Sequence, residues 1–341
     1  MAIIRMGVDL AKNVFAVHGV DEAGRVQLAR TVRREQLLEV LAAVPPCVVA
    51  MEACSGAHHW ARRLAAVGHT PRIMAPKFVA PYRMSGKKGK NDANDAAAIC
   101  EAAGRPNMRF VPVKSVEQQA LLTLHRVRQG FVEERTATIN RLRGLLSEFG
   151  IVLPQKAATV RRQAARHLDP LPAWAQCALG DLLAQLAHLD QRVEQYDMHL
   201  KLVARDDARA QRLMHLRGVG PIGATAIVAT VGAAHEFTSG RQFAAWLGMV
   251  PRQHSSGGKQ RLGRITKAGD AYLRTLLIMG ARAVLAAAPG RNDRISRWAL
   301  ALQARRGYMR AVVAIAAKNA RLAWAMLRRG EDFRMHEVAA L

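Results

Sequence analysis

Two aspartates three residues apart, Asp92 and Asp95, offer the clearest chemistry in the sequence. They stand in the run NDANDAAA at 91–98, whose alanines predict a helix. Residues i and i+3 share one face of a helix, so both carboxylates would point the same way. Like charges at that separation repel unless a cation lies between them. The pair therefore predicts a metal site or, alternatively, capping of the helix N-terminus, where Asp accepts N–H groups and suits the helix dipole.

Two further carboxylates, Asp9 and Glu52, end short segments that have the pattern of strands. Ligands of open α/β sheets bind at the carboxyl ends of the strands. The four carboxylates could thus form one cluster suited to the hard ions Mg²⁺ or Mn²⁺. Alternatively, Asp9 and Glu52 merely end their strands as solvated residues.

The elements that would position these carboxylates predict an α/β sheet with mixed pairing. Strands are expected at 3–9, 14–20, 25–32, 47–51 and 71–75, and helices at 34–43 and 56–67. The first three strands are separated by short links, which favours an antiparallel meander.

The chain is strongly basic, with 51 Lys and Arg against 26 Asp and Glu in 341 residues, a formal net charge of +25. Half of its residues are hydrophobic, so it can bury proper cores. A polyanion is the natural partner, and nucleic acid is the first candidate. An anionic membrane surface is the weaker alternative, because no basic cluster adjoins an amphipathic anchor.

No signal peptide or membrane span is expected. The most apolar stretch, Leu276 to Ala288, is interrupted by Arg282. The four cysteines show no C-x-x-C spacing, which argues against a zinc site or a redox pair. We expect a cytoplasmic protein.

Three motifs, GVD at 7–9, MEA at 51–53 and KNDANDA at 90–96, resemble those of the DEDD transposases of the IS110 family, including its IS1111 subgroup. The resemblance runs through the chain. It implies a RuvC-like, ribonuclease-H-type α/β domain over residues 1–112. It also implies that Asp9, Glu52, Asp92 and Asp95 are the metal ligands, for Mg²⁺ or for Mn²⁺ in its place. Such ions stabilise the entering and leaving oxygens of phosphoryl transfer.

Residues 113–206 predict two long helices with coiled-coil spacing, separated by a basic, proline-interrupted connection at 154–172. The first seam contains Leu124, Phe131, Thr138 and Leu145, with Val127, Ile139, Leu142 and Phe149 beside it. The second contains Leu182, Leu186, Leu189, Val193, Tyr196, Leu200 and Val203. The spacing leaves open whether the helices pair within one chain or between chains. The family resemblance favours a homo-oligomer, a dimer or tetramer, joined by this region.

Residues 207–341 predict a mostly α-helical domain, which begins with LRGVGPIGATA at 216–226. This stretch looks like a helix-hairpin-helix motif. Gly218 and Gly220 would let the backbone approach a nucleic-acid phosphate, and Arg212 and Arg217 flank the turn. The alternative is a glycine-rich turn between two packed helices.

The segment GMVPRQHSSGGKQRLGRITK at 248–267 predicts a flexible, basic, solvated loop. The family carries a catalytic serine in a P-x-x-x-S-S-G segment of this kind. The resemblance therefore implies Ser256 as the nucleophile, with Ser255 as the alternative. A serine hydroxyl needs activation. His254 is a candidate base, although residues two apart in an extended loop need not face each other.

Basic residues of the serine segment and of the run before the aspartate pair are expected to bind nucleic acid. Those of the serine segment would also hold the scissile phosphate and neutralise charge in the transition state. The basic residues are Arg252, Lys259, Arg261, Arg264 and Lys267 in the serine segment, and Lys87, Lys88 and Lys90 before the aspartate pair.

The resemblance implies a transposase or recombinase of a prokaryotic insertion sequence, associated with the nucleoid. It would cleave and exchange DNA strands through a phosphoserine linkage with Mg²⁺ at the carboxylates. A structured guide RNA, or bridge RNA, would pair with donor and target DNA. Two alternatives remain: a RuvC-like nuclease in which a metal-activated water attacks, and a non-catalytic nucleic-acid-binding protein.

Overall fold

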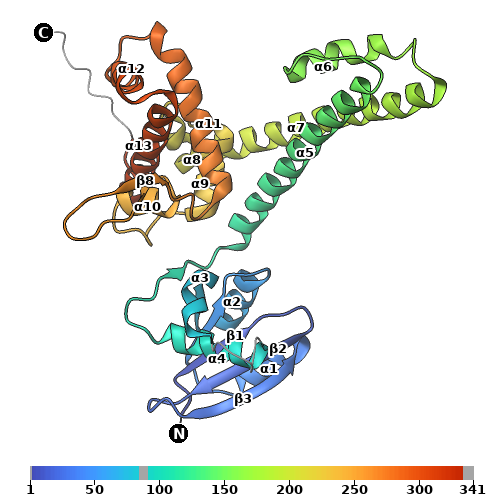
Figure 1. Ribbon diagram of the computed structural model, residues 1–341. Helices are drawn as coiled ribbons and strands as arrows, with labels where there is room; N and C mark the ends of the chain where they lie inside the picture. The colour runs from blue at the N-terminus through green and yellow to red at the C-terminus, as the bar shows by residue number, and fades with distance from the viewer. Residues whose placement is uncertain (1, 84–90, 333–341) are drawn as a thin grey trace, which may run out of the picture. The chain divides into compact units, whose positions relative to one another are not determined.

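The computed structural model describes residues 2–83 and 91–332, and the chain divides into two compact units, Met1–Ser115 and Val116–Leu341 (Figure 1). The expected domain boundary at 112/113 lies close to this division. The second expected boundary, at 206/207, lies inside the second unit.

The first unit is built on a six-stranded mixed sheet in the order β3-β2-β1-β4-β5-β6. The strands are β1 (Arg5–Asp9), β2 (Val14–Val20), β3 (Val26–Arg33), β4 (Val48–Glu52), β5 (Thr70–Met74) and β6 (Phe110–Val111). The first three form an antiparallel meander, β4 and β5 continue parallel to β1, and β6 closes the edge antiparallel to β5. The predicted α/β class and mixed pairing are confirmed, and β6 is an additional strand.

The helices of the first unit cover both faces of this sheet. They are η1 (Arg34–Gln36), α1 (Leu37–Ala42), α2 (Ala57–Ala66), α3 (Pro76–Val79), η2 (Ala80–Tyr82) and α4 (Asp92–Ala103). Met6 and Val8 of β1 pack with Trp60 and Leu64 of α2 in one core cluster. Ala50 of β4 belongs to a second cluster, which it shares with α4. Alternate residues of the central strands therefore face opposite helical layers.

The second unit begins with two long helices, α5 (Val116–Ser147) and α7 (Ala173–Asp206), which pack antiparallel within the chain. Arg128 pairs with Asp197, and Arg135 Nη1 lies 3.3 Å from Asp190 Oδ1. As the first residue number rises the second falls, as an antiparallel pair requires. The question of whether these helices pair within one chain is thus answered for this structure.

The predicted seam of the first long helix is wrong at Val127, Leu145 and Phe149, which are 36%, 40% and 44% exposed. Thr138, Ile139 and Leu142 of the predicted seam are buried, and so is Leu146, which was not part of it. A strict seven-residue repeat drifts by about 20° per heptad on a straight helix, so a seam that starts at Leu124 leaves the contact line after a few turns. In α7 the predicted positions Leu186, Leu189, Val193 and Leu200 are buried.

The proline-interrupted connection between these helices has helical structure of its own. It contains α6 (Ala157–Gln163) and η3 (Ala164–His167), and Val160 and Ala164 pack against the end of the helix pair.

The C-terminal part of the second unit is a helical cluster that carries one β-hairpin. Its elements are α8 (Ala208–Met214), α9 (Pro221–Val231), α10 (Gly240–Trp246), β7 (Pro251–Gln253), β8 (Leu262–Ile265), α11 (Ala271–Ala287), η4 (Ala288–Gly290), α12 (Arg294–Arg306) and α13 (Tyr308–Arg329). α11 and α13 cross at the centre of its core.

One segment of the described chain, Ala271–Gly290, is long and apolar enough to cross a membrane, which is weak grounds for a span when it stands alone. Leu273, Leu277 and Ala281 of this segment are buried in the helical core. This buried face of the segment packs against α13 and α9.

Candidate active site

Asp9 and Glu52 lie side by side because their strands are parallel neighbours in register. Val8 of β1 pairs with Met51 of β4, and each carboxylate is the next residue of its strand. Met6, Val8, Val49 and Met51 all belong to the core cluster on the α2 side. The alternation of strand side chains therefore directs Asp9 and Glu52 toward the opposite face, which α4 covers.

Gly7 allows α4 to approach this face closely. A Cβ at Gly7 would lie 2.2 Å from the Ala96 carbonyl oxygen and 2.5 Å from the Cys100 nitrogen. The Cys100 thiol lies 3.6 Å from the Arg5 carbonyl oxygen, so α4 runs antiparallel to β1. Its N-terminal turn, with Asp92 and Asp95, consequently lies toward the Asp9 end of the strand.

Asn91, and not Asp92 or Asp95, caps the N-terminus of α4. Asn91 is the N-cap, and its Oδ1 accepts a 2.8 Å hydrogen bond from the Asn94 nitrogen. The Asp95 carboxylate is buried instead and lies 2.9 Å from Arg83 Nε. The capping alternative thus does not explain Asp95.

Arg83, which the sequence did not single out, joins two of the predicted ligands. Its Nη2 donates a 2.7 Å hydrogen bond to Glu52 Oε1, while its Nε faces Asp95. The pairing brings together a residue just after η2, a strand end and a helix start. Because it depends on tertiary packing, no local spacing in the sequence indicates it.

The four carboxylates interact electrostatically. Burial, followed by the charges of Asp95, Asp92 and Glu52, raises the pKa of Asp9 from 3.8 to about 6, and Arg83 acts in the opposite direction. In the part of the chain that the structure describes, no three His, Cys, Asp or Glu side chains are placed to hold one ion together. The oxygen donors suit a hard divalent ion, and the cation among them is the Arg83 guanidinium.

The serine segment is a β-hairpin rather than a wholly flexible loop. β7 and β8 pair antiparallel, and Ser256 and Lys259 form a bridge at the tip. Gly257 and Gly258 between them have φ of +55° and +75°, as a type I′ turn requires of its two central residues. The Gly-Gly pair was the signal in the sequence for this hairpin.

The hairpin distinguishes the two serines. Ser255 Oγ accepts hydrogen bonds from the Arg261 nitrogen at 3.1 Å and from Gln253 Nε2 at 3.0 Å. Ser256 is exposed and takes part through its backbone, accepting a 3.1 Å bond from the Lys259 nitrogen. The Ser255 hydroxyl thus braces the hairpin, whereas that of Ser256 stands at its tip.

His254 and the basic residues are distributed along the hairpin, from its base to its tip. The His254 nitrogen donates to the Arg261 carbonyl at 2.9 Å, a bond of the hairpin backbone. Arg252, Lys259, Arg261, Arg264 and Lys267 are all exposed. Lys87, Lys88 and Lys90, which were also expected to bind nucleic acid, lie outside the described residues.

Close backbone contacts hold the base of the hairpin. A Cβ at Gly269 would lie 1.8 Å from the Trp246 carbonyl oxygen. Arg274 Nη1 donates to the carbonyls of Leu247 and Ala268 at 3.1 and 3.0 Å. The hairpin is therefore fixed to α10 and α11 at its base.

The glycine-rich turn before α9 packs inside the second unit. A Cβ at Gly218 would lie 2.6 Å from the Gly280 carbonyl oxygen of α11. Arg217 pairs with Asp293, which also caps α12. For Arg217 and Gly218, these contacts fit the alternative prediction of a turn between packed helices. Gly220 differs, because it is exposed at the N-cap of α9.

A buried polar network joins α5 to these helices and was not anticipated. His125, 1% exposed, lies 3.1 Å from both Tyr272 Oη of α11 and Thr225 Oγ1 of α9. Burial and the charge of Arg128 lower its pKa to about 4, so the imidazole is neutral. Tyr272 follows the hairpin base directly, and the network therefore links the long helices to the serine-bearing segment.

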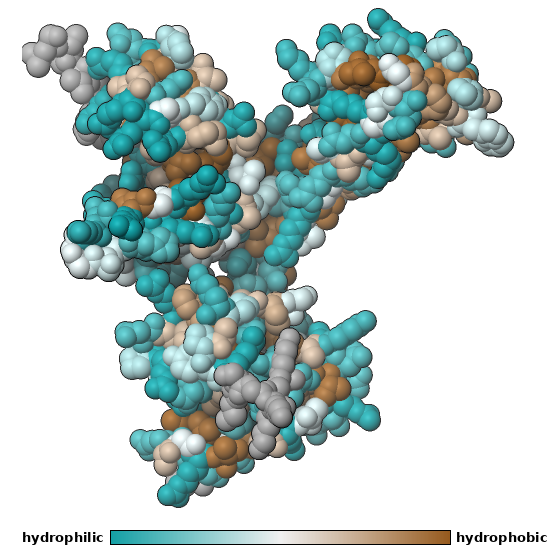
Figure 2. Space-filling model, in the orientation of Figure 1, coloured by the Kyte–Doolittle hydropathy of each residue, from teal (hydrophilic) through white to brown (hydrophobic). Residues whose placement is uncertain are grey.

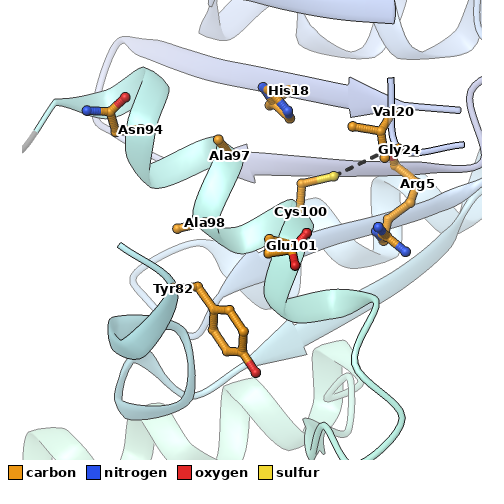
Figure 3. Close-up of a pocket in the computed structure, with 10 residues that line it drawn as sticks. All are labelled: Arg5, His18, Val20, Gly24, Tyr82, Asn94, Ala97, Ala98, Cys100 and Glu101. Carbon is orange, nitrogen blue, oxygen red and sulfur yellow. Dashed lines mark hydrogen bonds between the residues drawn. The ribbon is translucent and has the colours of Figure 1, made fainter. Parts of the chain in front are cut away.

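A pocket of about 240 Å³ in the first unit lies beside α4 and does not include the carboxylate cluster (Figure 3). Arg5, His18 and Tyr82 contribute to its lining, together with Asn94 and Glu101 of α4. Glu101 pairs with Arg105. The pocket contains none of the residues expected to act in catalysis.

Comparisons with known proteins agree along the whole chain. Residues 6–151 match the transposase family DEDD_Tnp_IS110, and residues 210–296 match the model described as Transposase IS116/IS110/IS902 family. A probable family 20 transposase of Pseudomonas aeruginosa is 50% identical over 98% of this chain and 99% of its own. The transposase for insertion sequence element IS1111A of Coxiella burnetii is 43% identical, over 96% and 91%. That for IS1328 of Yersinia enterocolitica is 38% identical, over 96% and 98%. The chain therefore belongs to the IS110 family of insertion-sequence transposases.

Proposed function

We propose that this transposase cleaves and rejoins DNA strands with Ser256 as nucleophile and with Mg²⁺, or Mn²⁺, held by Asp9, Glu52, Asp92 and Asp95. The observation that carries the proposal is the common facing of the two strand ends and the α4 N-terminus in the first unit. A meander followed by two parallel strands supports the RuvC-like assignment of this sheet.

In the proposed step, Ser256 Oγ forms a bond to a DNA phosphorus while the bond from phosphorus to the leaving sugar oxygen breaks. The serine proton passes to a nearby base or to solvent, and the leaving oxygen takes up a proton. A second sugar hydroxyl can then attack the phosphoserine, which restores the serine and joins a new pair of strands. A divalent ion at the carboxylates would neutralise charge on the entering and leaving oxygens. Arg252, Lys259 and Arg261 would hold the phosphate.

The proposed partners are donor and target DNA and a structured guide RNA. The net charge of +25 supports binding of both polymers. Gly220 at the start of α9, together with Arg264 and Lys267, would contribute phosphate contacts. The protein would act in the cytoplasm, at the nucleoid.

We also propose a homo-oligomer joined through the long-helix region. Apolar residues gather at the far end of the α5–α7 pair, over α6 (Figure 2), where Val152 and Trp174 are 85% and 88% exposed. Exposed apolar groups of this kind favour contact with another protein surface.

Covalent trapping tests the proposal. The wild type should form an adduct with DNA carrying the element's ends, resistant to detergent and sensitive to protease. Ser256→Ala and Asp9→Asn should lose the adduct, by 100-fold or about that, while DNA binding is retained. Ser255→Ala is the matched control and should keep most of the adduct, because the Ser255 hydroxyl is already engaged by Arg261 and Gln253 and the backbone hydrogen bonds of the hairpin remain in the variant. Cut DNA from Ser256→Ala without any wild-type adduct would favour attack by water, and full activity of Asp9→Asn would favour a non-catalytic role for the carboxylates.

A further inference from the structure

Arg83 forms ion pairs with two of the carboxylates of the first unit. Its Nη2 and Nε lie 2.7 Å from Glu52 Oε1 and 2.9 Å from Asp95 Oδ1. The Nη2 group donates a hydrogen bond to Glu52, whereas Nε is buried and contacts Asp95 as an ion pair without a hydrogen bond. A single guanidinium therefore pairs with both acids.

Glu52 and Asp95 are more deeply buried than Arg83, which matters for the replacement of Arg83 by a metal ion. The carboxylates are largely buried, with Glu52 and Asp95 side chains 15% and 9% exposed. Arg83 is 35% exposed and enters from a segment between η2 and α4 rather than from the sheet. The two acids are thus largely buried, whereas the Arg83 side chain is partly exposed to solvent.

The carboxylate oxygens of Glu52 and Asp95 cannot bind Arg83 and a metal ion at the same time. A divalent ion needs direct coordination by the carboxylates at about 2.1 Å, and it repels a guanidinium positioned within hydrogen-bond distance of those oxygens. One cation must leave when the other arrives.

We propose that Arg83 is a built-in counter-ion that offsets part of the negative charge of Glu52 and Asp95 in the metal-free protein and is displaced when the divalent ion binds. This inference rests on the metal site of the proposed function. Arg83 acts as a positioning residue: it keeps the acids gathered before the ion arrives, and it lowers the affinity for that ion. The released guanidinium remains beside the site, where an anionic phosphate would attract it.

A permanent structural role for Arg83 predicts the opposite change in metal affinity. If Arg83 simply orients the ligands as a permanent partner, its removal should weaken metal binding. If it competes with the metal, its removal should strengthen binding. The sign of the change in metal affinity therefore decides between the two.

The experiment is a titration of the full-length protein with Mn²⁺ at fixed pH, followed by electron paramagnetic resonance of the free ion. Arg83→Gln should bind Mn²⁺ about tenfold more tightly than the wild type, and Arg83→Lys should fall between them. Arg105→Gln is the matched control, since it breaks another arginine–carboxylate pair at α4, with Glu101, and should leave the affinity unchanged. Thermal melting in EDTA gives a second measure: Arg83→Gln should melt below the wild type and gain more from added Mg²⁺.

Unchanged or weaker Mn²⁺ affinity in both Arg83 variants, with normal binding by the wild type, would overturn the counter-ion role alone. A wild type that binds no Mn²⁺ would overturn the proposed metal site and this inference with it. If Arg83→Gln fails to fold, the affinity of Arg83→Lys still decides the matter.

Discussion

At the scale of single residues, the carboxyl group of Asp9 is surrounded by negative charge. Asp95, Asp92 and Glu52 all raise its pKa, burial contributes most, and Arg83 is the residue that acts against them. A proton, Arg83 and a metal ion are thus three ways to relieve the same repulsion. They should compete, because each removes negative charge from one cluster.

This competition predicts a pH dependence of stability in the metal-free protein. The folded pKa of Asp9, about 6, lies above the value of 3.8 for an unperturbed Asp. The folded state therefore binds the proton more tightly, so this contribution to stability is complete below pH 4 and is lost as pH rises through 6. Urea unfolding in EDTA should show the wild type losing stability relative to Asp9→Asn between pH 4.5 and pH 7. A difference that stays constant across this range would contradict the assignment.

The sequence could predict these carboxylates but not their counter-ion. Asp9 and Glu52 follow apolar strands, and Asp92 and Asp95 share a helix start, so local periodicity was enough to find them. Arg83 is 31 residues from Glu52 in the chain and meets it only when α4 and η2 pack. A contact made by tertiary packing has no spacing rule, and the sequence reading passed over it.

At the scale of elements, close backbone contact holds α11 against the turn before α9 in the second unit. Gly218 in the turn before α9 meets Gly280 of α11, where a Cβ at Gly280 would lie 1.8 Å from the Gly218 carbonyl oxygen. Arg217 next to this turn pairs with Asp293 at the start of α12. The turn that resembled a phosphate-binding motif thus also determines how three helices pack.

Gly280→Ala should therefore destabilise the protein, by about 1–3 kcal/mol, because backbone has to move to admit the methyl group. Gly144→Ala in α5 is the matched control, since a Cβ there meets open space. Alanine is the better helix former, so this change should stabilise by about 0.5–1 kcal/mol. Chemical denaturation of the two variants measures both effects. Equal behaviour of the two glycines would argue against the close contact.

Element prediction succeeded where pattern and packing agree. The strands and α7 were predicted from the spacing of apolar residues, and most of those residues are buried in the core. The seam of α5 failed at Leu145 and Phe149, because a heptad extrapolated from one end ignores the pitch of a straight helix. The β7–β8 hairpin was missed, although Gly257 and Gly258 form a pair that a type I′ turn favours.

At the scale of the whole molecule, the proposed chemistry is divided between the two units. The carboxylates belong to the first and Ser256 to the second, and each unit has core clusters of its own. The net charge of +25 is common to the chain as a whole, and it supports a long polyanionic partner that can engage both units.

That charge predicts a steep fall of DNA affinity with salt, since each phosphate contact releases about 0.9 counterion on duplex DNA. Neutralising Lys259 and Arg261 together at the hairpin tip should weaken binding to all sequences alike and reduce the slope of log K against log salt by about 2. Arg205→Gln is the control, because this exposed arginine already pairs with Asp206 and should leave the slope unchanged. Fluorescence anisotropy with duplexes of unrelated sequence, between 50 and 300 mM salt or about that range, gives the slopes. If the double variant kept the wild-type slope, the hairpin tip would not be contacting phosphates, and the placement of Ser256 at the scissile bond would lose its electrostatic basis.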